Sequence, residues 1–127
     1  MRITGLYAAL GTILVVILSL RVVLYRFRHK IGLGDGDDRE LRKRIRAQGN
    51  CIEYLPLGLL LLLLLELEQT SPTALHACGI TLVLARAAHA WGLSRHGGVS
   101  PGRFAGTALT MGVLLAMAGL LARPWLG

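Results

Sequence analysis

The chain has 127 residues, of which 54% are hydrophobic and 17% are charged, and its formal net charge is +7. A soluble domain carries about 25% charged residues, whereas most of the charges here gather between residues 26 and 46. This segregation is typical of a multi-span membrane protein, and it argues against a nucleic-acid-binding protein, which needs basic and aromatic side chains on an exposed surface.

Four hydrophobic stretches follow one another along the chain, at residues 3–25, 45–67, 73–93 and 104–121. Each is close to the roughly 20 residues that a helix needs to cross a bilayer. The first has a longer apolar core than a signal peptide, so we interpret it as a retained span. We therefore predict an all-α fold, an integral membrane four-helix bundle that forms a single domain over residues 1–127.

The connections between these stretches differ in charge. The first is rich in lysine and arginine, the third carries Arg95 and Arg103, and the second, at residues 66–73, has no lysine or arginine. Because positively charged connections stay in the cytoplasm, we expect the first and third connections on that side and both termini outside.

The second stretch opens with a stripe of polar side chains. Arg46, Asn50 and Glu53 fall within roughly 60° of one another on a helix of 3.6 residues per turn. Ionisable groups in a span are costly, about 2.5–3.5 kcal/mol each at the bilayer centre. An aligned stripe of this kind therefore indicates a binding site.

Polar residues on the third and fourth spans are predicted to lie near the same end of the bundle. Arg86 and His89 lie three residues apart on the third span, and Arg86 needs a partner, for which Glu53 is at a comparable depth. An Arg86–Glu53 ion pair could simply fix two helices, or both side chains could also hold a ligand. Arg103, at the start of the fourth span, is either an interfacial arginine or a guanidinium that binds an anion.

Small residues predict where helices pack closely. Gly102 with Gly106, and Ala108 with Gly112, form two small-xxx-small pairs on the fourth span. Such pairs let backbones approach closely, so we expect tight helix packing here, which could also join two subunits.

The cysteines and histidines do not have the spacing of metal ligands, so no metal site is predicted. Cys51 and Cys78 belong to opposite ends of their spans, at depths that differ by about 15 Å at 1.5 Å per residue. Because a disulfide requires Cα atoms within about 7 Å, both are expected to be free thiols.

The polar groups suit a small molecule with two carboxylates and an amine. Arginine binds carboxylates bidentately, and Glu53 could accept an ammonium group. Glutathione has this pattern together with a thiol, whose pKa of about 8.5 makes it a weak nucleophile at neutral pH. A nearby guanidinium favours the thiolate and so activates it.

The run Arg-Ala-Gln-Gly-Asn-Cys-Ile-Glu-Tyr-Leu-Pro at residues 46–56 resembles the MAPEG family, the membrane-associated proteins in eicosanoid and glutathione metabolism. It is most similar to the second span of the cysteinyl-leukotriene synthase branch. The Leu-Gly-Asp-Gly loop, the Arg86-x-x-His89-Ala-x-Gly92 run and the length resemble small bacterial members. The resemblance implies a membrane-embedded homotrimer in a bacterial inner membrane, with glutathione bound between subunits on the cytoplasmic side.

The resemblance also implies roles for individual residues. Arg103 matches the arginine that stabilises the thiolate, which makes it the catalytic candidate. Positions that contact glutathione are matched by Arg26, Arg46, Gln48, Asn50, Glu53, Tyr54, Arg86 and His89. Arg21 competes with Arg26 for the first-span position. Leu93 replaces a tyrosine of the leukotriene enzyme, which argues against a leukotriene substrate.

These features predict a glutathione transferase that conjugates glutathione to lipophilic electrophiles arriving from the membrane lipid, a detoxification reaction, with peroxidase activity as a possible addition. A non-catalytic lipid-binding or scaffold membrane protein of the same family is the alternative, so enzymatic activity stays open. A transporter or proton relay would also place ionisable residues in spans, but the sequence lacks the inverted repeats of such proteins.

Overall fold

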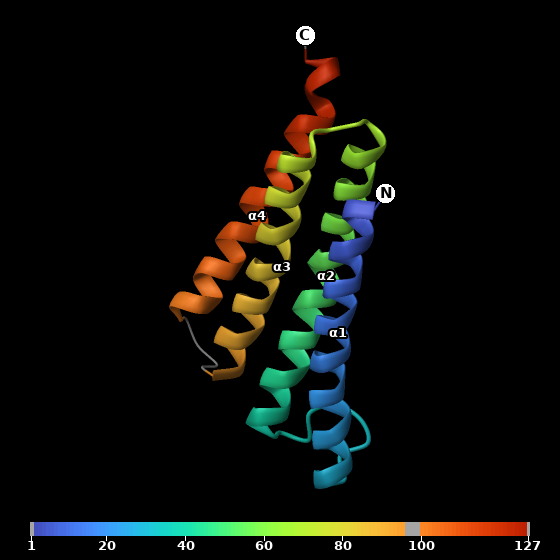
Figure 1. Ribbon diagram of the computed structural model, residues 1–127. Helices are drawn as coiled ribbons and strands as arrows, with labels where there is room; N and C mark the ends of the chain where they lie inside the picture. Colours follow the sequence, from blue (N-terminus) through green and yellow to red (C-terminus); the bar gives the residue numbers. More distant parts are fainter. Residues whose placement is uncertain (1, 96–99, 127) are drawn as a thin grey trace.

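The computed structural model describes residues 2–95 and 100–126. The helices are α1 (Arg2–His29), α2 (Arg39–Leu67), α3 (Pro72–Arg95) and α4 (Pro101–Ala122), followed by the short 3₁₀ helix η1 (Arg123–Trp125). They run up and down side by side, which confirms the predicted all-α membrane bundle (Figure 1). We call the end with the α1–α2 connection and the start of α4 the basic end. Part of the predicted third connection, residues 96–99, lies outside the described residues.

Local capping decides where two of the helices begin. The Asp38 side chain accepts a hydrogen bond from the Leu41 amide at 3.1 Å, so α2 begins at Arg39, six residues before the predicted span. Such an N-cap satisfies one of the amides that have no partner in the first turn. Ser100 caps α4 in the same way, and Pro101 follows it at the first helical position, where proline is favoured.

Helices α2 and α3 each pack against the three other long helices of the bundle. Among the described residues, α1, α2 and the stretch Pro101–Trp125 are long and apolar enough to cross a membrane, and α3 is not one of the three. Polar residues such as Arg86 and His89 lower the mean hydropathy of α3, and both side chains are buried within the bundle. Of the four predicted spans, length and composition thus support three.

The helices are apolar on their outer faces as well as inside. Leu55 and Leu62 of α2 are buried in the core, whereas Leu57, Leu60 and Leu64 of the same helix are exposed. A helix in a soluble protein would place polar residues on that outer face. The outer leucines therefore suit a hydrocarbon environment, as expected for a membrane protein.

Helices α3 and α4 approach each other closely at Gly106. A Cβ atom placed there would lie 2.7 Å from the Ala85 carbonyl oxygen and 2.7 Å from the His89 amide nitrogen. Both are backbone atoms of α3, so they cannot move aside without shifting the helix. The small residues at this end of α4 therefore pack against α3 within the chain.

We expect Gly106→Ala to destabilise the bundle by about 1–3 kcal/mol, the usual effect of overpacking. Gly112→Ala is the matched control on the same helix, because a Cβ there meets nothing within 4 Å among the described residues. Thermal unfolding in detergent should show a lower midpoint for Gly106→Ala only. Equal midpoints for the two variants would contradict the close contact.

Candidate functional site

A cationic cavity of about 280 Å³ opens at the basic end, between α2, α3 and α4. Its lining consists of five basic side chains and one leucine, namely Arg39, Arg42, Lys43, Arg46, Leu93 and Arg103. The predicted ligand-binding Arg46 and the predicted catalytic Arg103, which are far apart in sequence, thus line the same space. We call it the arginine cavity.

Helix α2 supplies most of the arginine cavity. Arg39, Lys43 and Arg46 are spaced by four and three residues, which places them on one helical face. Sequence reasoning missed Arg39, Arg42 and Lys43 because the span was predicted to begin only at residue 45. The signal was present, since the same spacing continues the stripe that starts at Arg46.

Arg103 is positioned by two features of its surroundings. Its amide donates a hydrogen bond to the capping Ser100 hydroxyl at 3.2 Å. The end of α3 comes so close that a Cβ on Gly92 would lie 2.6 Å from the Arg103 amide nitrogen. Arg103 also lines a second cavity of about 290 Å³, shared with Ser100, Phe104 and Thr107. It therefore stands between the arginine cavity and a space beside the first turns of α4.

Carboxylates at the rim neutralise part of this charge. Arg42 pairs with Asp35 at 2.7 Å, Lys43 with Glu40 at 3.1 Å, and Arg46 with Glu53 at 3.5 Å. Glu40 also pairs with Arg44 at 3.0 Å, so one carboxylate is shared by two cationic side chains. The cavity is chemically suited to an anion with more than one negative group.

A second set of predicted residues surrounds Arg86 in the interior. The Arg86 Nε donates to the Thr110 hydroxyl at 2.9 Å, and its Nη1 donates to the Asn50 side-chain oxygen and, at 3.3 Å, to the Asn50 carbonyl. Its guanidinium lies 5.2 Å from the centre of the Tyr54 ring, a cation–π distance. Arg86 therefore connects α2, α3 and α4.

The prediction of an Arg86–Glu53 ion pair is wrong, because the two side chains do not pair. Glu53 pairs with Arg46, and its side chain is 52% exposed, whereas Arg86 is 1% exposed. The rotation of α2 turns Asn50 inward and leaves Glu53 on an open face, so the buried guanidinium meets an amide instead of a carboxylate. His89 is buried as well, and its backbone and Cβ pack against α4 at Gly106.

Two predicted residues point elsewhere. Gln48 donates a hydrogen bond to the Ser19 hydroxyl of α1 at 3.2 Å. Arg26 donates to the Gly34 carbonyl at 2.7 Å and so holds the α1–α2 connection. The structure thus distributes the predicted residues over the arginine cavity, the Arg86 cluster and the region where α1 meets α2 and the α1–α2 connection.

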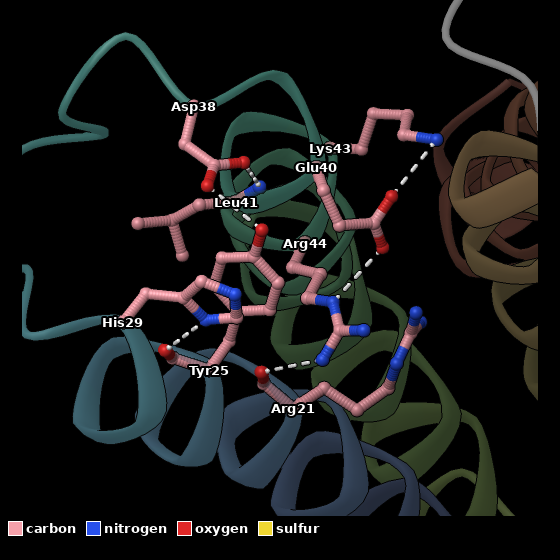
Figure 2. A network of polar contacts seen from close by, with 8 residues as sticks. All are labelled: Arg21, Tyr25, His29, Asp38, Glu40, Leu41, Lys43 and Arg44. Carbon is pink, nitrogen blue, oxygen red and sulfur yellow. Dashed lines mark hydrogen bonds and ion pairs between the residues drawn. The ribbon is translucent and has the colours of Figure 1, made fainter.

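A polar network joins α1 to the start of α2 (Figure 2). Asp38 accepts hydrogen bonds from the Tyr25 hydroxyl at 2.7 Å and from the Leu41 amide. The bond from Tyr25 is the main cause that lowers the pKa of Asp38 below its ordinary value of 3.8. The charged form of Asp38 therefore stabilises the end of the bundle that carries the arginine cavity.

This lowered pKa predicts a pH dependence. Because the folded-state pKa of Asp38 lies below its unfolded value, the stabilisation is present above the unfolded pKa and is lost as the pH falls through the folded one. Asp38→Asn keeps a capping side chain without the charge. The wild type should have a higher melting temperature than Asp38→Asn from pH 7 to pH 5. The difference between the two melting temperatures should shrink below pH 3.8. A difference that stays constant across this range would contradict the role of the charge.

Comparison with known proteins places the chain in one family of membrane proteins. Residues 4–123 match the model of the MAPEG family. The chain is 34% identical over 125 residues to the inner membrane protein YecN of Escherichia coli K12, covering 97% of this chain and 94% of that protein. YecN of Escherichia coli O6:H1 strain CFT073 matches with the same identity and coverage. The chain therefore belongs to the MAPEG family of membrane proteins.

Proposed function

We propose that this protein is a glutathione transferase that conjugates glutathione to lipophilic electrophiles in a bacterial inner membrane, with reduction of hydroperoxides as a side activity. The observation that carries the proposal is that Arg46 and Arg103, from different helices, line one cavity. Family membership supports a role in glutathione chemistry.

The residues of the arginine cavity fit glutathione. Glutathione has two carboxylates and one ammonium group, and its thiolate form carries one further negative charge. Arg39, Arg42 and Arg46 can each bind a carboxylate bidentately. Glu53 can accept the ammonium group, because its pair with Arg46 is half exposed and such pairs contribute little. The cationic lining complements the net negative charge of the thiolate form.

Arg103 is the residue to which we assign the catalytic role. Glutathione supplies the nucleophilic sulfur when it is bound. The Arg103 guanidinium favours the deprotonated sulfur, as a nearby positive charge lowers the pKa of a thiol. The neighbouring cavity beside Phe104 and Thr107 gives a lipophilic electrophile a place next to the same guanidinium.

The placement of Gln48 and Arg26 favours a site shared between subunits. Both lie toward α1, so a ligand in the arginine cavity of one chain does not reach them. A homotrimer in which the α1 side of one subunit covers the arginine cavity of its neighbour would bring all of these residues to one ligand. Arg26 and Ser19 share a face of α1, whereas Arg21 lies on another, so we assign the first-span role to Arg26.

The proposal is tested by the ultraviolet absorption of the thiolate when glutathione is added to the purified protein at neutral pH. We expect a thiolate band with glutathione and none with S-methylglutathione, which binds through the same carboxylates but has no ionisable thiol. Absence of the band in wild type, or the same band in Arg103→Ala, would contradict thiolate activation by Arg103.

A further inference from the structure

Another cationic cavity, separate from the two described above and of about 300 Å³, lies between α1 and α2 at the basic end. Its lining consists of Ile17, Leu20, Arg21, Leu24, Tyr25, Arg28 and Arg44. It shares no residue with the arginine cavity. We call it the α1 cavity, and the proposed transferase activity does not require it.

The lining of the α1 cavity combines apolar and cationic groups at different depths. Ile17, Leu20 and Leu24 are exposed leucine and isoleucine side chains in the apolar part of α1. Arg28 lies about 16 Å closer to the end of the helix than Ile17, at 1.5 Å per residue. Ile17, Leu20 and Leu24 form an apolar wall, in which Arg21 lies between the two leucines along the helix, and Arg28 lies nearer the membrane surface.

Arg44 is held in place before any ligand binds (Figure 2). Its Nε donates to Glu40 at 3.0 Å, its Nη1 donates to the Arg21 carbonyl at 3.1 Å, and its guanidinium stacks over the Tyr25 ring at 4.6 Å. A fixed cation loses little conformational entropy on binding. Glu40 is shared between Arg44 and Lys43, and Arg21 and Arg28 add two further guanidinium groups to the lining.

We infer that the α1 cavity binds the head group of an anionic phospholipid, whose acyl chains lie along Ile17, Leu20 and Leu24. Guanidinium groups match the geometry of a phosphate, and basic pockets between transmembrane helices bind anionic head groups. Tyr25 has the amphipathic ring that is favoured at a membrane interface. A water-soluble anion would use the arginines but leave the apolar wall without a partner.

The lipid site is independent of the proposed glutathione site. Ile17, Arg21, Leu24 and Arg28 fall within roughly 60° of one another on α1, and Arg26 points about 170° away from them. A lipid in the α1 cavity therefore leaves the face of α1 with Arg26 open for the neighbouring subunit. Loss of one site would not remove the other.

The test is a thermal titration of the full-length protein, delipidated in detergent, with phosphatidylglycerol or with phosphatidylcholine of the same acyl chains. A ligand that binds only the folded state raises the melting temperature. We expect phosphatidylglycerol to act at a lower concentration than phosphatidylcholine, and soluble glycerol phosphate to have no effect. Arg28→Gln should weaken the response to phosphatidylglycerol by about five-fold, because each basic residue near the surface adds to the attraction.

Lys30→Gln is the matched control, since Lys30 lies two residues from Arg28 and lines a different cavity. It should respond like the wild type. Equal responses to the two lipids, an equal loss in Arg28→Gln and Lys30→Gln, or stabilisation by glycerol phosphate at the same concentration as the lipid would each overturn the inference.

Discussion

Replacement of Arg103 by alanine is expected to lower kcat for glutathione conjugation by about 10²–10³-fold, the usual cost of removing one electrostatic stabiliser. The reason is that Arg103, whose backbone is held next to Ser100 and Gly92, carries the guanidinium assigned to the thiolate. Steady-state kinetics with an activated aryl halide as electrophile would measure the effect. Arg46→Ala should instead raise KM for glutathione, because Arg46 is assigned to binding.

Two variants make the Arg103 experiment specific. Arg103→Lys keeps the charge but loses the planar guanidinium, so its rate should fall between those of wild type and alanine variant. Arg123→Ala removes an arginine from η1, at the opposite end of the bundle, and should not change the rate (Figure 1). If Arg103→Ala kept the wild-type kcat, the catalytic assignment would be wrong.

Replacement of Arg86 by alanine is expected to destabilise the folded bundle by about 3–5 kcal/mol, the range for truncating a large buried side chain. The side chain is one of the largest that are fully buried, and its loss leaves Asn50 and Thr110 without their donor. It also leaves a cavity where α2, α3 and α4 meet. The melting temperature in detergent should fall by about 10 °C or more.

Arg46→Ala is the control for stability. Its side chain is half exposed and its ion pair with Glu53 is 3.5 Å long, so its removal should cost less than about 1 kcal/mol. Equal melting temperatures for Arg86→Ala and Arg46→Ala would show that Arg86 does not hold the three helices together.

The sequence was sufficient to predict the helices, because a run of about 20 apolar residues is typical of a helix that spans a membrane. It did not predict where α2 begins. Asp38 lies before the predicted span, but it caps α2 and binds Tyr25, which extends the helix back to Arg39. The basic residues before Arg46 then become part of a helical face rather than a simple membrane flank, and they line the arginine cavity.

The partner of Arg86 could not be predicted for a different reason. Helical periodicity places Asn50 and Glu53 on nearly the same face of α2, and charge alone favours Glu53. The rotation of α2 relative to α3 decides between them, and it depends on how core residues such as Cys51, Leu55 and Leu82 pack. The same rotation turns Gln48 toward α1, so residues that are neighbours in the 46–56 run serve three different environments.

Calorimetric titration of the detergent-solubilised protein with glutathione, for wild type and Arg46→Ala, tests the central claim most directly. If the arginine cavity is the glutathione site, the wild type binds and the variant binds at least about ten-fold more weakly, as expected for the loss of a charged hydrogen bond. Absence of binding to the wild type, or equal affinity in the two proteins, would contradict the assignment of glutathione to this cavity.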